Sequence, residues 1–264
     1  MNIQRKLFII RHAERVDFTF GAWIPKCFDC SGKYVRQNLN MPSSVPVRSG
    51  GPQAFFKDCP LTNIGLHQAT LTGEALKEAS ISFVDVYSSP SLRCIQTCTN
   101  VLNGMGQTDL AINLEPGLFE WLGWYQDGMP EWMTMEELKN CRFNINEKYK
   151  PVITENEIRN KNESGEEYYM RSYYVTQTLL EKSCQPGQTL LLVGHAATLD
   201  TCTRQLTGHP PRSSNDIVHR VHGIPYCAVA TAEEDENGKW ALVCPPVLPL
   251  THTANMGFDW KHLL

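Results

Sequence analysis

KLFIIRHAERVDF, residues 6–18, contains an apolar run from Leu7 to Ile10 that ends abruptly at Arg11 and His12. Four consecutive apolar residues have the length of a buried strand, whereas arginine and histidine are rarely buried without a specific partner. The stretch therefore predicts a strand in the core of the molecule whose carboxyl end opens onto a polar site.

Two later segments repeat this organisation. An apolar run at residues 83–87 leads into a Ser/Pro loop and then a helical pattern with Arg93 in its first turn. Residues 190–193 predict a strand, Gly194 and His195 a turn, and residues 196–206 a helix that stops before Gly208. Helical patterns at residues 66–77 and 168–182 lie between these units. We predict an α/β fold with a mostly parallel central sheet and helices on both faces, in which ligands bind at the carboxyl ends of the strands.

The composition argues against several kinds of function. The chain has 264 residues, 42% of them hydrophobic and 20% charged, enough to bury an ordinary core. A net charge of −4 provides no broad basic face for a nucleic acid or an anionic membrane, and no apolar run reaches the roughly 18 residues of a membrane span. Ten scattered cysteines, with no apolar run long enough for a signal peptide, indicate a reducing, cytoplasmic location.

Two long segments interrupt the alternation of strands and helices. Residues 17–60 are rich in Gly, Pro, Asn and aromatic residues, and residues 120–160 contain several tryptophans and tyrosines. Long loops in a compact domain are usually functional or disordered, and a high aromatic content argues against disorder. We expect one domain, residues 1–264, with these two cap segments over the site.

Arg11, Arg15, Arg93, His12 and His195 follow three separate strands, so the predicted fold brings them together. Several guanidinium groups at one place suit a dianion with several oxygens, such as a phosphate. Two imidazoles beside them allow nucleophilic and acid–base chemistry near neutral pH. The pattern predicts a phosphate site at this edge of the sheet.

Four motifs in the expected order resemble those of the histidine phosphatase superfamily, the phosphoglycerate mutase-like group. They are RHAER at 11–15, LTNIGLHQA at 61–69, SSPSLRCIQT at 88–97 and VGHAATL at 193–199. FGAWIPKCFD, NLNMP, LEPGLFEW, IPYC and PLTH further resemble the insect ecdysteroid-phosphate phosphatases and the phosphatase domain of the suppressor of T-cell receptor signalling proteins.

The resemblance implies a role for each site residue. It makes His12 the nucleophile that becomes a phosphohistidine, and it places Arg11, Arg15, Arg93 and His195 around the phosphoryl oxygens. Glu120 of LFEW falls at the position of the general acid. No metal or other cofactor is implied. Ala13 replaces the usual glycine of RHG and removes no catalytic group.

Other interpretations of the sequence compete with this one. Residues 30–36 (CSGKYVR) have the C-x5-R spacing of cysteine-dependent phosphatases, but bulky residues fill the loop and no strand precedes it. Cys27 with Cys30, or His219 with His222, has the spacing of half a zinc site. A phosphate-binding module without activity and a mutase are further alternatives. The aromatic residues Phe18, Phe20, Trp23, Trp121 and Trp124 predict a roomy entrance, which favours a phosphatase over a mutase.

The substrate has two candidate classes. A phosphorylated small molecule with a bulky apolar body, a steroid phosphate above all, fits the aromatic cap segments. The alternative is a phosphotyrosine protein, although the chain carries no recognisable ubiquitin-binding or SH3 module. We expect no nucleic-acid or membrane partner, and a homodimer stays open.

Overall fold

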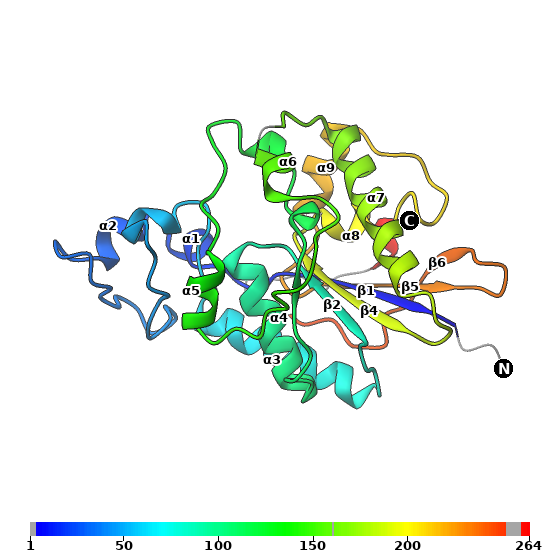
Figure 1. Ribbon diagram of the computed structural model, residues 1–264, viewed down its shortest axis with the longest axis horizontal. Helices are drawn as coiled ribbons and strands as arrows, with labels where there is room; N and C mark the ends of the chain where they lie inside the picture. Colours follow the sequence, from blue (N-terminus) through cyan, green and yellow to red (C-terminus); the bar gives the residue numbers. More distant parts are fainter. Residues whose placement is uncertain (1–3, 160, 252–259) are drawn as a thin grey trace.

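A six-stranded sheet forms the centre of the molecule (Figure 1). The computed structural model describes residues 4–159, 161–251 and 260–264. In spatial order the strands are β3 (Asn113–Leu114), β2 (Asp85–Ser88), β4 (Thr189–Gly194), β1 (Lys6–Arg11), β5 (Val229–Glu234) and β6 (Trp240–Val243). β1, β2, β3 and β4 run parallel, and β5 pairs with β1 in the antiparallel sense. The predicted mostly parallel α/β sheet is confirmed.

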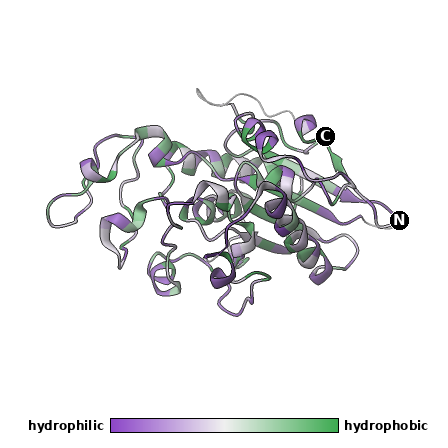
Figure 2. Cartoon of the chain, turned by 90° about the horizontal axis from the view of Figure 1, so that it is seen from above, coloured by the Kyte–Doolittle hydropathy of each residue, from purple (hydrophilic) through white to green (hydrophobic). Residues whose placement is uncertain are grey.

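The central strands are buried on both faces, which explains their continuous apolar runs. Successive side chains of a strand point to opposite faces, so Phe8 and Ile10 pack in one core cluster while Leu7 and Ile9 pack in another. Figure 2 shows the apolar residues concentrated in the strands at the centre of the fold. The sheet is therefore a rigid platform for the residues that follow its strands.

Helices cover both faces of the sheet. α3 (Asn63–Glu78) and α4 (Leu92–Met105) pack on the face of Phe8 and Ile10, and α7 (Gly165–Lys182) and α8 (Thr198–Thr201) pack on the other. α9 (Ser214–Val221) lies beside α7, and η4 (Trp260–Leu263) ends the chain. The helices predicted at residues 66–77 and 168–182 correspond to α3 and α7.

The helix predicted over residues 196–206 is wrong in length. Only α8 is regular, and the chain continues as hydrogen-bonded turns to Gly208. Thr203 and Thr207 each donate their hydroxyl to the carbonyl four residues earlier, that of Leu199 and of Thr203, at 2.7 and 3.0 Å. Such side-chain bonds compete with regular helix geometry, and β-branched residues also disfavour it.

Most of the two predicted cap segments is loop with short helices. The first contains α1 (Val16–Phe20), α2 (Ile24–Cys27) and η1 (Gly51–Phe55). The second contains η3 (Leu122–Trp124), α5 (Met135–Asn140) and α6 (Glu155–Arg159), and η2 (Pro116–Leu118) precedes it. Trp23 and Phe55 of the first segment share an apolar cluster with Met133 and Leu138 of the second, beside α4.

The helices in the described parts of the chain are all too short or too polar to cross a membrane.

Candidate active site

The candidate site lies at the carboxyl ends of β1, β2 and β4. Parallel pairing places Arg11 opposite Gly194 and Ser88 opposite Val193. The amide of His12 donates to the Gly194 carbonyl at 2.9 Å, and the amide of Ser89 donates to the Val193 carbonyl at 2.9 Å. The sheet thus fixes the backbone of the loops that carry the site side chains.

The contacts of Glu14 explain why the RHAER stretch contains an acidic residue. Its Oε1 accepts hydrogen bonds from Thr62 at 2.7 Å and from Asn40 at 2.9 Å, and its side chain is buried. Gly65 lies so close that an added Cβ would approach the Glu14 carbonyl oxygen to 2.3 Å. Glu14 therefore fastens the loop after β1 to the start of α3. The Ala13 methyl group packs in the core cluster beneath this loop.

His12 is a buried, neutral imidazole with a defined tautomer. Its Nδ1 lies 2.9 Å from the Ala13 carbonyl oxygen, which can only accept, so Nδ1 carries the proton and the lone pair is on Nε2. Burial lowers the pKa of His12 well below its ordinary value, and the charges of Arg93 and Arg11 lower it further. The lone pair on Nε2 is therefore unprotonated at neutral pH.

His195 has the opposite tautomer. Nη2 of Arg93 donates to Nδ1 at 3.1 Å, so Nε2 carries the proton and donates to the Ser89 hydroxyl at 2.9 Å. Burial and the charge of Arg93 lower the pKa of His195 well below its ordinary value. The two rings meet edge to face with their centroids 5.6 Å apart.

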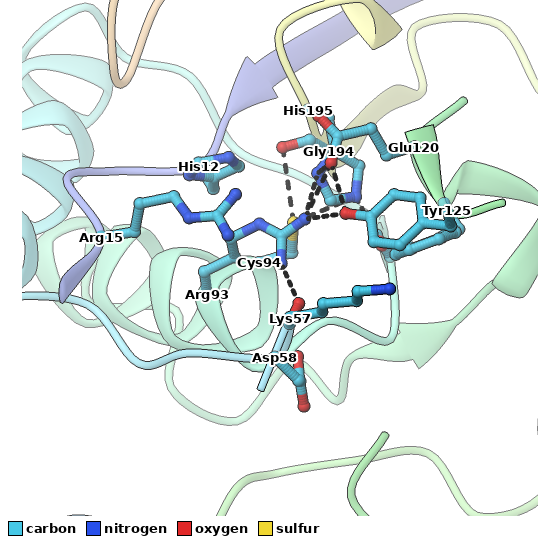
Figure 3. A network of polar contacts seen from close by, with 12 residues as sticks. His12, Arg15, Lys57, Asp58, Arg93, Cys94, Glu120, Tyr125, Gly194 and His195 are labelled. Atoms are coloured by element: carbon cyan, nitrogen blue, oxygen red, sulfur yellow. Dashed lines mark hydrogen bonds and ion pairs between the residues drawn. The ribbon is translucent and has the colours of Figure 1, made fainter. Parts of the chain in front are cut away.

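Arg93 is the central cation of the site, and Figure 3 shows it among the polar side chains. It is fully buried in the first turn of α4, the position that the sequence predicts. Nη2 donates to Glu120 Oε2 at 3.1 Å, and Nη1 donates to the Lys57 carbonyl at 3.4 Å. Arg93 thus joins the floor of the site to both cap segments.

Arg15 and Arg11 are each oriented by a partner that the sequence analysis did not find. Arg15 forms two hydrogen bonds of 2.6 Å with the carboxylate of Asp17 and lies 4.2 Å from the Phe18 ring centre. The guanidinium of Arg11 donates to the Ile224 carbonyl and lies 4.4 Å from the Tyr226 ring centre. Asp17 and Phe18 lie two and three residues after Arg15 in the opening stretch. The Arg11 contacts instead depend on the folding of a distant loop, so no local spacing reveals them, although Tyr226 belongs to the IPYC motif.

Glu120 enters the site from the loop after η2. Its Oε2 accepts from Tyr125 at 2.8 Å as well as from Arg93, and it lies 3.7 Å from His195 Nδ1. The loop is held from behind by Arg171, which donates to the carbonyls of Phe119 and Glu120 and pairs with Glu163. The structure therefore brings all six predicted site residues, Arg11, His12, Arg15, Arg93, Glu120 and His195, to one place.

A cavity of about 770 Å³ opens beside these residues. Its walls combine both cap segments with Val218 and Val221 of α9 and with His222, which follows that helix; the sequence analysis did not place these three residues there. The walls of the cavity are mainly apolar and contain Phe18, Ala22, Trp23, Ile24, Pro25, Phe55, Phe56, Trp124, Val218 and Val221.

Two of the aromatic residues expected at the entrance lie elsewhere. Phe20 packs at the edge of the apolar cluster around Trp23. Trp121 packs against Trp124 and donates its indole N–H to the Glu163 carbonyl at 3.0 Å. Phe18, Trp23 and Trp124 do line the cavity.

Among the described residues, the geometry supports neither the C-x5-R loop as a phosphate site nor a zinc site. Just before the 30–36 loop, the carboxylate of Asp29 accepts from the amides of Ser31 and Lys33, so these two donors of the loop are already bound. The guanidinium of Arg36 donates to the carbonyls of Asn38 and Leu39. Within residues 4–159, 161–251 and 260–264, no group of three or more His, Cys, Asp or Glu side chains is arranged to hold a metal ion.

Two imidazoles and three arginines lie together at the carboxyl edge of a mostly parallel sheet. This arrangement is typical of sites that transfer phosphoryl groups. The model of the histidine phosphatase superfamily (branch 1) matches residues 49–244. The chain belongs to this family.

The relatives and solved structures that resemble the chain include two groups with different names. The chain is 49% identical to the ecdysteroid-phosphate phosphatase of Drosophila melanogaster, and the match covers 98% of this chain. It is 43% identical to the ubiquitin-associated and SH3 domain-containing protein B of Homo sapiens, and that match covers 99% of this chain. The crystal structure of the ecdysone phosphate phosphatase of Bombyx mori in complex with tungstate superimposes with a TM-score of 0.84 at 33% identity, covering 98% of this chain and 100% of that one.

The chain spans 34% and 41% of the lengths of these two curated relatives. A phosphoglycerate mutase of Bacillus anthracis shares the fold, with a TM-score of 0.55 at 17% identity, and covers 99% of this chain and 96% of its own.

Proposed function

We propose that this chain hydrolyses phosphomonoesters through a phosphohistidine formed on Nε2 of His12. The observation that carries the proposal is the neutral His12, whose Nδ1 is bound to the Ala13 carbonyl and which lies among the charges of Arg11, Arg15 and Arg93. Three guanidinium groups supply preorganised positive charge for the phosphoryl oxygens, which is the main requirement for phosphoryl transfer. The membership of the family supports the same chemistry.

The reaction proceeds in two balanced steps. In the first, Nε2 of His12 attacks phosphorus, the bond to the leaving oxygen breaks, and Glu120 gives that oxygen a proton. In the second, water attacks phosphorus, Glu120 takes a proton from the water, and the bond between phosphorus and Nε2 breaks. The three arginines hold the phosphoryl oxygens throughout, and His195, which accepts from Arg93, orients that guanidinium. Neither step needs a metal ion, so we expect excess chelator to leave activity intact.

We further propose a steroid phosphate, of the ecdysteroid type, as the substrate. A cavity of about 770 Å³ with mainly apolar walls accommodates a rigid, apolar body beside the phosphate site. Burial of such a body contributes about 25 cal/mol per Å². The names of the Drosophila and Bombyx relatives support this substrate, and the name of the SH3-containing relative keeps a phosphotyrosine protein as the second candidate.

We infer that residues 1–264 act as one catalytic domain with cap segments at about 17–60 and 120–160. The supporting observations are that both segments line the cavity and that they share an apolar cluster with α4.

Trapping the intermediate tests the chemistry. Wild-type protein quenched during turnover of a labelled phosphomonoester is expected to carry label that is labile in acid and stable in base, as a phosphohistidine is. His12→Ala is expected to lose both label and turnover while it keeps its fold, whereas the control His67→Ala, at an exposed position of α3, keeps both. Label on a cysteine would refute the proposal.

A comparison of two substrates tests the specificity. We expect a higher kcat/KM for an ecdysteroid phosphate than for a phosphotyrosine peptide on the same preparation. A preference of about tenfold or more for the peptide, equivalent to about 1.4 kcal/mol, would replace the steroid proposal by the phosphotyrosine one.

A further inference from the structure

Among the described residues, the carboxylate of Glu120 makes all of its hydrogen bonds through one oxygen. Oε2 accepts from Tyr125 at 2.8 Å and from Arg93 at 3.1 Å, and the described residues provide no hydrogen bond to Oε1. The side chain is 15% exposed and lines the cavity. Oε1 is therefore the oxygen that remains available to a ligand in the cavity.

Tyr125 is held firmly in place. A short turn through η3, closed by the Tyr125 amide on the Leu122 carbonyl at 2.9 Å, returns the chain to Glu120. The Tyr125 ring lies 4.9 Å from that of Phe119, centre to centre, and the ammonium of Lys57 lies 5.9 Å from its centre on the cavity side. Lys57 in turn donates to Asp127 and to the Gly128 carbonyl, just beyond Tyr125.

A phenol held in this way is a permanent donor to the carboxyl group. Burial and the neighbouring charge of Glu120 raise the pKa of Tyr125, so its O–H keeps its proton. Its single hydrogen points to Oε2, and Arg93, which also lies 3.4 Å from the phenol oxygen, donates to the same atom. The two donors, Tyr125 and Arg93, orient the carboxyl group of Glu120. Because both bond Oε2, the proton of the neutral carboxyl group is on Oε1.

We propose that Tyr125 is a positioning residue for the acid step: it holds Glu120 so that Oε1 meets the leaving oxygen, and it stabilises the carboxylate that forms. This inference rests on the proposed function of Glu120. As Oε1 gives its proton to the leaving oxygen, negative charge develops on the carboxyl group, and a hydrogen bond to a charged group is stronger than one to a neutral group. The phenol keeps its own proton throughout.

The dependence of the rate on the leaving group tests the proposal. Substituted phenyl phosphates of similar size cover good leaving groups, such as p-nitrophenol, and poor ones, such as phenol, without changing the fit to the cavity. Tyr125→Phe is expected to lower kcat/KM about tenfold or more for phenyl phosphate and less than about threefold for p-nitrophenyl phosphate. A steeper dependence on leaving-group basicity is a readout that general loosening of the fold would not produce.

A second variant shows whether Tyr125 acts through Glu120. Glu120→Gln alone is expected to steepen the same dependence, and adding Tyr125→Phe to it is expected to cause no further steepening. The matched control is Tyr149→Phe, because Tyr149 donates to the carboxylate of Glu115 at 2.7 Å outside the cavity. It should leave the dependence as in the wild type.

Equal losses for all leaving groups, or an undiminished effect of Tyr125→Phe in the Glu120→Gln background, would overturn the proposal. Absence of a phosphoenzyme in the wild type would instead overturn the proposed function, so the two failures are distinguishable.

Discussion

At the scale of single residues, the site depends on two histidines that are kept neutral with opposite tautomers. The Ala13 carbonyl fixes the proton of His12 on Nδ1, and Arg93 fixes that of His195 on Nε2. Both rings are buried beside arginines, which disfavours a further positive charge. The same cations that suit a phosphate dianion thus also keep the proposed nucleophile unprotonated.

Removal of one of these cations is expected to raise the pKa of His12. Arg11→Gln removes a like charge that lowers it, so the imidazolium form becomes less unfavourable and His12 titrates at higher pH. NMR titration of the ring protons without substrate measures this directly, free of the ionisation of a phosphate. Arg36→Gln, on the distant 30–36 loop, is the control. A lower or unchanged pKa of His12 in Arg11→Gln would contradict the electrostatic account.

The strand-end side chains could be predicted from the sequence, whereas their partners could not. Arg11, His12 and His195 follow apolar runs, so topology alone places them together. Tyr226 and Lys57 act through contacts between segments far apart in the sequence, and loop conformation is set by tertiary packing. Lys57 even adopts a left-handed backbone, with φ of 65°, which no sequence signal would suggest for a lysine.

At the scale of elements, the close packing of α3 against α4 positions Arg93. Gly73 faces the backbone of Val101, and Gly104 faces that of Thr70, so the two helix backbones nearly touch. The periodicity of these helices was predictable, but their approach was not, because glycine in a helix carries no signal of which neighbour it meets. In α8 the periodicity itself was misleading. The pattern predicted a longer helix, but threonine side chains bond the backbone and the regular helix is short.

Gly73→Ala is expected to destabilise the fold by about 1–3 kcal/mol or more, because an added Cβ would lie 2.0 Å from the Val101 carbonyl oxygen. Chemical denaturation measures the free energy of unfolding. Glu74→Ala, at the exposed neighbouring position, should change it by less than about 0.5 kcal/mol. Equal stability of the two variants would show that the helices separate without cost.

The support of the Glu120 loop by α7 leads to another expectation. Arg171 pairs with Glu163 at 2.6 Å, and both side chains are almost fully buried. Arg171→Met leaves the Glu163 charge without its partner and should lower the free energy of unfolding by about 3–5 kcal/mol. Arg159→Met removes the more exposed pair with Glu155 and should cost less than about 1 kcal/mol. If denaturation experiments showed that the two variants lose a similar free energy of unfolding, this account would be contradicted.

At the scale of the whole molecule, ion pairs join the two cap segments. Buried Arg48 of the first contacts Asp58 at 3.3 Å and Glu137 of the second at 3.4 Å. Lys57 of the first, which lines the cavity, pairs with Asp127 of the second. Burial raises the pKa of Asp58 to about 6, although Arg48 opposes the rise. The two cap segments around the cavity are therefore joined to each other by ion pairs, and Arg93 joins both of them to the site at the strand ends.

An oxyanion that mimics phosphate should stabilise this assembly. Tungstate at about one hundred times its Kd should contribute about 2.7 kcal/mol and raise the Tm by about 5–10 °C. Arg93→Met, which removes the central cation, is expected to abolish most of this shift, and Arg36→Met is expected to retain it. A full shift in Arg93→Met, measured by calorimetry, would place tungstate elsewhere on the protein.

The side chains at the strand ends and the side chains that line the cavity belong to different parts of the fold, and this has an evolutionary consequence. Reactive groups stand on strand ends that the core fixes, while Phe18, Phe56, Trp124 and Val218 face the cavity from surface segments and are themselves partly exposed. Replacing such a wall residue alters the shape offered to a substrate without disturbing any bond to His12. Descendants of one ancestral catalyst can therefore adopt new substrates through a few surface substitutions while the reaction itself stays the same.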